Sequence, residues 1–158
     1  MFSTKEIAKI TGGELIGGSI RVNSVSTDTR TLKKGAHFIA EKGERFDSHD
    51  NIKQAAENGA AAAISDLAAG TVKTSIPVVY VRNSRTAQLK LARYYRDKFD
   101  IKLCGVTGSV GKTSTKDMVS EVLSVKYSTL KTEGNLNNDI GLPKTLFRLN
   151  KNTEAAVI

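Results

Sequence analysis

The sequence predicts an α/β fold, because short apolar strands alternate with amphipathic helices along most of the chain. Apolar runs at 60–64 and 77–81 are typical of buried strands, and helical patterns precede the first at 52–58 and follow the second from Ser84. Alternation of this kind indicates a mostly parallel sheet. After Asp100 a new strand, a glycine-bearing turn and a helix follow in succession, which indicates a second structural unit.

We therefore expect two domains, a small α/β domain at 1–100 and the first part of a parallel-sheet domain at 101–158. The chain of 158 residues is long enough to bury a core in this arrangement. No apolar run approaches the roughly 20 residues that a membrane helix needs, and no signal-peptide pattern follows Met1. The only cysteine, Cys104, excludes an internal disulfide, and we expect it to be a small buried side chain. These features indicate a cytoplasmic protein.

The net charge of +8 is distributed along the chain without a concentrated basic block. Proteins that bind nucleic acid usually gather basic residues on one face, often with stacking aromatic side chains. This chain has no tryptophan, and its tyrosines do not alternate with a basic cluster. The composition therefore argues against a nucleic-acid partner and favours a solvated basic surface that also suits a polyanionic small substrate.

The first domain opens with a helix, because Ser3 and Glu6 have the spacing of a capping box and Gly12 follows the last apolar position. The glycine pair at 17–18 marks a turn between two strands. The further elements expected before Asp100 are strands at 14–16, 20–26 and 36–40, a polar loop at 41–50, a helix that Gly59 ends, strands at 60–64 and 77–81, and a helix capped by Ser84 whose apolar face carries Leu91, Ala92, Tyr95 and Phe99.

The second domain shows the same alternation of strand and helix. Its expected elements are a strand at 101–103, a helix from about Lys112 with a buried stripe of Met118, Val119, Val122 and Leu123, a strand at 126–130, a polar loop at 132–143, a short helix that ends at Phe147 and Leu149, and a strand at 155–158.

The glycine-bearing turn that precedes Lys112 carries the strongest functional signal. Its order is Gly-x-x-Gly-Lys-Thr from Gly108 to Thr113, and Val106 replaces the first glycine of the full Walker pattern. The N–H groups of such a loop and the positive end of the next helix favour an anion such as a nucleotide phosphate. Lys112 would reach the outer phosphates, and the Thr113 hydroxyl would bind magnesium. The residues alone also allow an ordinary strand-to-helix turn that holds a lysine.

The polar loop at 132–143 is a second candidate site, because it places Asn135, Asn137 and Asn138 close together. Side-chain amides offer donors and acceptors, which suits a polar ligand or a loop that braces itself with turns. The loop follows the glycine turn by one helix and one strand. In a parallel sheet both loops would therefore leave the same carboxyl edge, where ligands bind.

The two motifs together resemble those of the Mur ligase family. They read TGSVGKTSTK at 107–116 and TEGNLNNDIGLP at 132–143. The runs at 26–30, 34–40 and 43–49 resemble the uridine-nucleotide domain that precedes the ATPase domain in this family. The resemblance departs from the family pattern at Val110, at His37 and at Ser48, and the last two affect the expected shape of the uridine pocket.

The resemblance implies a set of site residues in each domain. The expected ATP-binding residues are Thr107, Gly108, Ser109, Val110, Gly111, Lys112, Thr113 and Ser114, with Lys112 catalytic and Thr113 a metal ligand. The expected substrate-binding residues are Ser26, Asp28, Thr29, Arg30, His49, Asn135, Asn137 and Asn138. For Asp28 and Arg30 an internal ion pair that braces a turn is an open alternative, and for His49 a hydrogen bond within its loop is another.

Within the family, the chain is similar to the member that joins D-alanyl-D-alanine to UDP-N-acetylmuramoyl-tripeptide (UDP-MurNAc-tripeptide). This resemblance implies ATP and Mg²⁺ as cofactors and an acyl-phosphate intermediate on the tripeptide carboxylate. It also implies that the family's magnesium-binding glutamate and its acceptor domain lie beyond the matching part. We therefore expect no ligase activity from these 158 residues alone. We expect the full-length ligase to be a monomer and this chain to self-associate through an open sheet edge.

Other functions remain open from the residues. One is a non-catalytic nucleotide-binding module, and another is a different Mur-type ligase. A P-loop kinase or GTPase is a further alternative, but a GTPase should carry Asn-Lys-x-Asp after a later strand, and the run at 150–153 lacks the aspartate.

Overall fold

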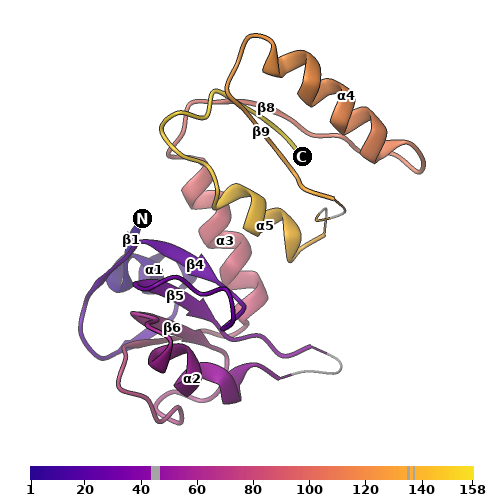
Figure 1. Cartoon of the computed structure of the whole chain (residues 1–158). Coiled ribbons are helices and arrows are strands. Elements are labelled where there is room, and N and C mark those ends of the chain that lie inside the picture. Colours follow the sequence, from indigo (N-terminus) through magenta and orange to yellow (C-terminus); the bar gives the residue numbers. More distant parts are fainter. Residues whose placement is uncertain (44–46, 135, 137) are drawn as a thin grey trace. The chain divides into compact units, whose positions relative to one another are not determined.

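The computed structural model describes residues 1–43, 47–134, 136 and 138–158, and these form two compact units, Met1–Leu91 and Ala92–Ile158 (Figure 1). The division falls within helix α3 (Ser84–Arg96), before the predicted boundary at Asp100. The limits of the functional domains stay a prediction.

The first unit is built on a five-stranded sheet that is mostly parallel, as the sequence predicts. Its strands, in spatial order, are β2 (Glu14–Ile16), β7 (Val78–Tyr80), β6 (Ala62–Ser65), β5 (Ala36–Ile39) and β4 (Ser24–Ser26). Strands β4 to β7 pair in parallel, and β2 joins the edge of β7 antiparallel. The carboxyl ends of the four parallel strands consequently meet at one edge of the sheet.

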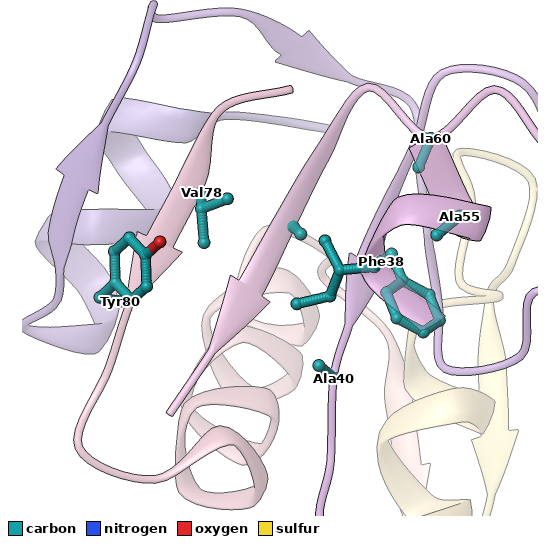
Figure 2. Packing of buried hydrophobic residues seen from close by; sticks show 8 residues of the cluster. Phe38, Ala40, Ala55, Ala60, Val78 and Tyr80 are labelled. Carbon is teal, nitrogen blue, oxygen red and sulfur yellow. The ribbon is translucent and has the colours of Figure 1, made fainter. Parts of the chain in front are cut away.

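Both faces of the central strands are buried, because every residue of β5, β6 and β7 is buried. Phe38 and Ala40 lie on one face with Tyr80 and pack against Ala55 of α2 (Ile52–Glu57). Figure 2 shows the Phe38 ring beside this helix. The continuous apolar runs of these strands therefore reflect a parallel sheet that is buried on both faces.

The first helix forms as its capping signals predict. Helix α1 (Thr4–Thr11) has a complete capping box between Ser3 and Glu6, and Gly12 ends it in the left-handed conformation at φ 72°. The segment expected to be loop at 41–50 ends in a short 3₁₀ helix, η1 (His49–Asn51), that leads directly into α2.

The single strand expected at 20–26 is wrong, because the chain changes sheets at Asn23. Strand β3 (Arg21–Val22) pairs antiparallel with β1 (Phe2–Ser3), whereas β4 joins the large sheet. The Asn23 backbone N–H donates to the Gly35 carbonyl at 3.2 Å, and its side-chain amide donates to the Lys34 carbonyl at 3.0 Å. These bonds fix the chain beside the turn before β5 and end the pairing with β1.

The cap of α3 is Asn83 rather than Ser84. The Asn83 side-chain oxygen accepts a hydrogen bond from the Thr86 backbone N–H at 2.8 Å, so Ser84 is already the first helical residue. Ser84 is buried, and its backbone N–H donates to Asp66 at 3.0 Å. A residue that caps a helix must precede its first helical residue, and Ser84 is one position too late to do so.

The second unit contains a three-stranded parallel sheet in the order β8 (Lys102–Cys104), β10 (Ala155–Val157) and β9 (Thr129–Lys131). Helix α4 (Lys112–Ser124) lies on one side of these strands and α5 (Gly141–Leu146) on the other (Figure 1). Leu146 and Leu149 form a core with Ala92 and Ala156 on the α5 side. Cys104 is half-buried rather than buried.

The buried stripe expected on α4 is wrong for Met118 and Val122, whereas Val119 and Leu123 are half-buried. Met118 is 70% exposed and Val122 is 72% exposed, whereas Lys116 and Ser120 are buried. The buried side of the helix therefore combines Lys116 and Ser120 with the half-buried Val119 and Leu123. The short helix expected to end at Phe147 and Leu149 begins within the predicted loop, because α5 spans Gly141–Leu146.

None of the helices in the described part of the chain combines the length and the apolar character required to cross a membrane.

Candidate functional site

The glycine turn leaves β8 and enters α4, as its sequence pattern predicts. Gly111 has φ 78° and directly precedes Lys112, the first residue of α4. Gly108 also has a positive φ, of 153°. Side chains disfavour such angles, so glycines at these two positions allow the tight bend. The loop is open to solvent, since Thr107 to Gly111, Thr113 and Ser114 are all exposed.

Lys112 lies over the loop that it follows. Its ammonium nitrogen donates to the Gly108 carbonyl at 2.6 Å, and the residue is half-buried. This contact places a positive charge at the mouth of the turn, beside the first N–H groups of α4. A loop backbone, a helix N-terminus and a lysine together can hold an anionic phosphate.

The residues in and around the loop fit a phosphate-bound magnesium better than a metal held by protein carboxylates. The Thr113 hydroxyl is exposed in the first turn of α4, which suits one ligand of an octahedral ion that keeps several water and phosphate ligands. Across the residues that the structure describes, no cluster of three or more His, Cys, Asp or Glu side chains could hold a metal ion by itself.

The polar loop after β9 leaves the same sheet edge as the glycine turn, because β8 and β9 both run parallel to β10. The Asn138 side-chain oxygen accepts from the backbone N–H groups of Ile140 at 3.2 Å and Gly141 at 2.8 Å. This bonding is the self-bracing arrangement that the sequence left open. Asn135 and Asn137 lie outside the described residues.

Lys116 is a residue of this region that the motif analysis missed. Its ammonium nitrogen donates to the carbonyls of Thr132 at 2.6 Å and Gly134 at 3.1 Å, so it joins α4 to the start of the polar loop. The available signal was its spacing of one helical turn from Lys112, since residues four apart share a helix face.

The run that contains Ser26, Asp28 and Arg30 forms a compact turn after β4. The Asp28 carboxylate accepts from the Arg30 backbone N–H at 2.9 Å and from its guanidinium at 3.0 and 2.7 Å. This bonding raises the pKa of Arg30, although its side chain is 86% exposed. Ser26 exchanges hydrogen bonds with the Asp28 backbone, and the Thr29 carbonyl accepts from Asn58. The Asp28–Arg30 pair is thus the turn-bracing ion pair considered as the alternative.

His49 is buried between two carboxylates. Its Nδ1 lies 2.5 Å from an Asp47 oxygen, its Nε2 lies 2.8 Å from an Asp66 oxygen, and its side chain is 4% exposed. Hydrogen bonds from the His49 backbone and ring lower the pKa of Asp47. Asp66 follows β6 and also accepts from the Ser84 N–H at the start of α3. His49 therefore connects its own segment to Asp66 after β6, and Asp66 in turn binds the start of α3.

The expected site residues consequently fall into two groups. Those expected to bind ATP, together with Asn138, belong to the second unit, at the carboxyl edge of the β8-β10-β9 sheet. Those expected to bind the uridine nucleotide belong to the first unit, at the carboxyl edge of its parallel strands. Whether each one contacts a ligand stays a prediction.

Two family descriptions match separate parts of the chain. The family model described as "Mur ligase family, catalytic domain" matches residues 21–96, and the model described as "Mur ligase middle domain" matches residues 106–158. The chain belongs to the Mur ligase family, whose members are ATP-dependent.

Within this family, the chain is similar to MurF ligases. The UDP-N-acetylmuramoyl-tripeptide–D-alanyl-D-alanine ligase of Escherichia coli is 43% identical over 97% of this chain, and that of Bacillus subtilis is 41% identical over 99%. This chain covers 33% and 35% of those proteins, so it spans about a third of their length.

Solved structures of MurF share the fold. A crystal structure from Acinetobacter baumannii matches 99% of this chain and 35% of its own length, with a TM-score of 0.88 and 34% identity. The Thermotoga maritima structure, a complex with ADP, matches 86% of this chain and 31% of its own, with a TM-score of 0.76 and 37% identity.

Proposed function

We propose that this chain provides the sugar-nucleotide-binding part and the start of the ATP-binding part of a ligase that joins D-alanyl-D-alanine to UDP-MurNAc-tripeptide, a step of peptidoglycan precursor synthesis. The names of the similar proteins support this assignment over that of another Mur-type ligase. The proposal covers the activity of a protein about three times as long as the matching region.

The observation that carries the proposal is the pairing of two loops at one sheet edge. The open glycine turn follows β8, and the asparagine-containing loop follows β9, on either side of β10. The edge formed by the carboxyl ends of parallel strands is where α/β proteins bind nucleotides. The ADP complex of the similar Thermotoga maritima MurF is consistent with a nucleotide at this edge.

The proposed reaction faces two difficulties. A carboxylate is a weak electrophile, and it must approach an anionic triphosphate against electrostatic repulsion. In the proposed reaction the tripeptide carboxylate takes the terminal phosphoryl group, and the amine of D-alanyl-D-alanine then displaces phosphate. Lys112 would leave the Gly108 carbonyl and donate to the outer phosphates, which offsets charge in the transition state. A magnesium ion held by Thr113 would supply further charge neutralisation.

The sugar-nucleotide half of the proposal rests on the first unit. Its sheet edge presents the exposed Arg30 guanidinium near the end of β4, and arginine suits the diphosphate of a uridine nucleotide. The Asp28–Arg30 pair holds that guanidinium in place, and His49 braces the neighbouring loop from within.

The test is a coupled assay of the complete product of the gene that encodes this chain, with MgATP, UDP-MurNAc-tripeptide and D-alanyl-D-alanine. We expect phosphate release that requires both other substrates, and a product whose mass shows the dipeptide in amide linkage. Lys112→Ala should lower kcat/KM by about 10²- to 10³-fold, because it removes positive charge beside the transferring phosphoryl group. The matched control is Lys126→Ala, an exposed lysine after the end of α4.

Two outcomes would count against the proposal. Binding of MgADP in calorimetry without turnover by the complete gene product would favour a nucleotide-binding module. Turnover that accepts a single amino acid in place of the dipeptide would favour a different Mur-type ligase.

A further inference from the structure

Lys116 is a buried cation on the sheet-facing side of α4. Its side chain is 8% exposed, and its ammonium nitrogen lies 2.6 Å from the Thr132 carbonyl oxygen and 3.1 Å from the Gly134 carbonyl oxygen. The nearby Asp117 carboxylate is 3.8 Å away and half exposed. The charge is thus held mainly by two backbone carbonyls.

Burying an ammonium group at this position costs free energy. Removing an isolated charge from water costs several kcal/mol unless hydrogen bonds compensate it. An apolar side chain of similar length, such as methionine, would cover the sheet without that cost. Packing alone therefore does not account for a charged side chain at this position.

The two carbonyls that Lys116 binds indicate its role. The Thr132 N–H still donates to the Val157 carbonyl of β10 at 3.1 Å, so the chain is bound to the sheet at Thr132. Gly134 has φ 53° and turns the chain away. Lys116 donates hydrogen bonds to the Thr132 and Gly134 carbonyls, where the chain leaves the sheet and the polar loop begins.

We propose that Lys116 is a positioning residue that fixes the start of the polar loop relative to the phosphate loop. Lys112 and Lys116 are one turn apart on the same helix, so the helix links the group over the glycine turn rigidly to the group that holds Thr132 and Gly134. This inference rests on the proposed function, in which the two loops hold two substrates that must meet.

The expected consequence is a separation of turnover from nucleotide binding. Lys116→Met in the complete gene product should lower kcat by about 10- to 100-fold, because misplacing reacting groups by about 1 Å costs about that much. The dissociation constant for MgADP should change by less than about threefold, since the glycine turn and Lys112 remain. Lys126→Met is the matched control, and both its kcat and its MgADP affinity should equal those of the wild type.

Hydrogen exchange on the 158-residue chain tests the contact itself without any assay of turnover. Lys116→Met should speed exchange at the backbone amides of Gly134 and of 138–141, whereas the amides of β8 should exchange as before. If Lys116→Met does not fold, Lys116→Gln provides the second variant. Its neutral amide can donate to one of the two carbonyls, and we expect a smaller loss of kcat and of protection.

The outcomes distinguish this inference from the proposed function. A wild-type gene product without ligase turnover would overturn the proposed function, and the exchange experiment would still decide whether Lys116 holds the loop. An active wild type with Lys116→Met equally active and equally protected would overturn the inference alone. A loss of MgADP affinity in proportion to kcat would also overturn it, because Lys116 would then serve the phosphate loop rather than the relation between the loops.

Discussion

His37 is a titratable side chain placed where the sheet of the first unit is fully buried. It is 0% exposed on β5, and within the described part of the chain neither ring nitrogen has a hydrogen-bond partner. Burial lowers the pKa of His37 to about 3, because the charged form loses its hydration. The sequence shows this histidine only as a departure from the family pattern, and the structure places it in the interior of the sheet.

This burial predicts an acid-sensitive stability. The folded chain keeps His37 neutral down to a pH of about 3, whereas the unfolded chain takes up a proton below about 6.5, so the free energy of unfolding falls as the pH drops through that window. Between pH 7 and pH 5 the contribution amounts to about 2 kcal/mol. We expect urea unfolding of wild type and His37→Leu to show this difference in pH dependence. Parallel pH profiles would contradict it.

His49 shows how a motif residue can serve the scaffold. Its family resemblance predicts substrate contact, and the structure gives both of its ring nitrogens carboxylate partners on different segments. Sequence reasoning identified the hydrogen-bonded alternative but could not name Asp66, which lies 17 positions along the chain.

At the scale of the element, α4 is the clearest departure from the hydrophobic pattern. Its apolar residues Met118 and Val122 are 70% and 72% exposed, whereas Lys116 and Ser120 are buried beside the half-buried Val119 and Leu123. Pattern analysis assumes that the more apolar face is buried. Here the strands β9 and β10 lie against the other face, where a small serine allows close approach and a lysine reaches the next loop.

This orientation predicts opposite results for two neighbouring substitutions. Ser120→Leu inserts a large side chain at a position that is 3% exposed, so it should lower the free energy of unfolding by about 1–3 kcal/mol. Val122→Ser changes an exposed side chain and should alter that free energy by less than about 0.5 kcal/mol. Urea denaturation of the 158-residue chain measures both. A larger loss for Val122→Ser would show that the apolar face is the buried one.

At the scale of the whole molecule, the candidate nucleotide site lies entirely within the second unit. Every residue expected to bind ATP falls between Ala92 and Ile158, and the expected uridine-binding residues in the run at 26–30 and at His49 fall between Met1 and Leu91. We therefore expect a nucleotide held by these residues to stabilise the second unit directly.

The expected result is regional protection by nucleotide. MgADP at about 100 times its dissociation constant should stabilise the binding-competent state by about 2.7 kcal/mol. Hydrogen exchange should slow across α4 and the strands β8 and β10 and remain unchanged in β5 and β6. Lys112→Ala should remove the effect. Equal protection of both units would show that the nucleotide site is not confined to the second one.

Much of the architecture could be predicted because its signals are local. The capping box at Ser3, the start of α4 at Lys112 and strand β2 follow from residues adjacent in sequence, which set backbone conformation directly. The glycine turn and the asparagine-rich run likewise indicate a phosphate loop and its neighbour. Strand and helix limits elsewhere shift by a few residues, because pairing partners decide where an element stops.

The sequence by itself determined the α/β class, the family and the two candidate ligand loops, since these depend on residue type and short-range spacing. Only the tertiary structure decided that the chain changes sheets at Asn23, that α4 buries Lys116 rather than Val122, and that His49 lies between Asp47 and Asp66. The physical reason is distance along the chain. The bonds from Lys116 reach 16 and 18 positions ahead, and no local pattern specifies a partner at that range.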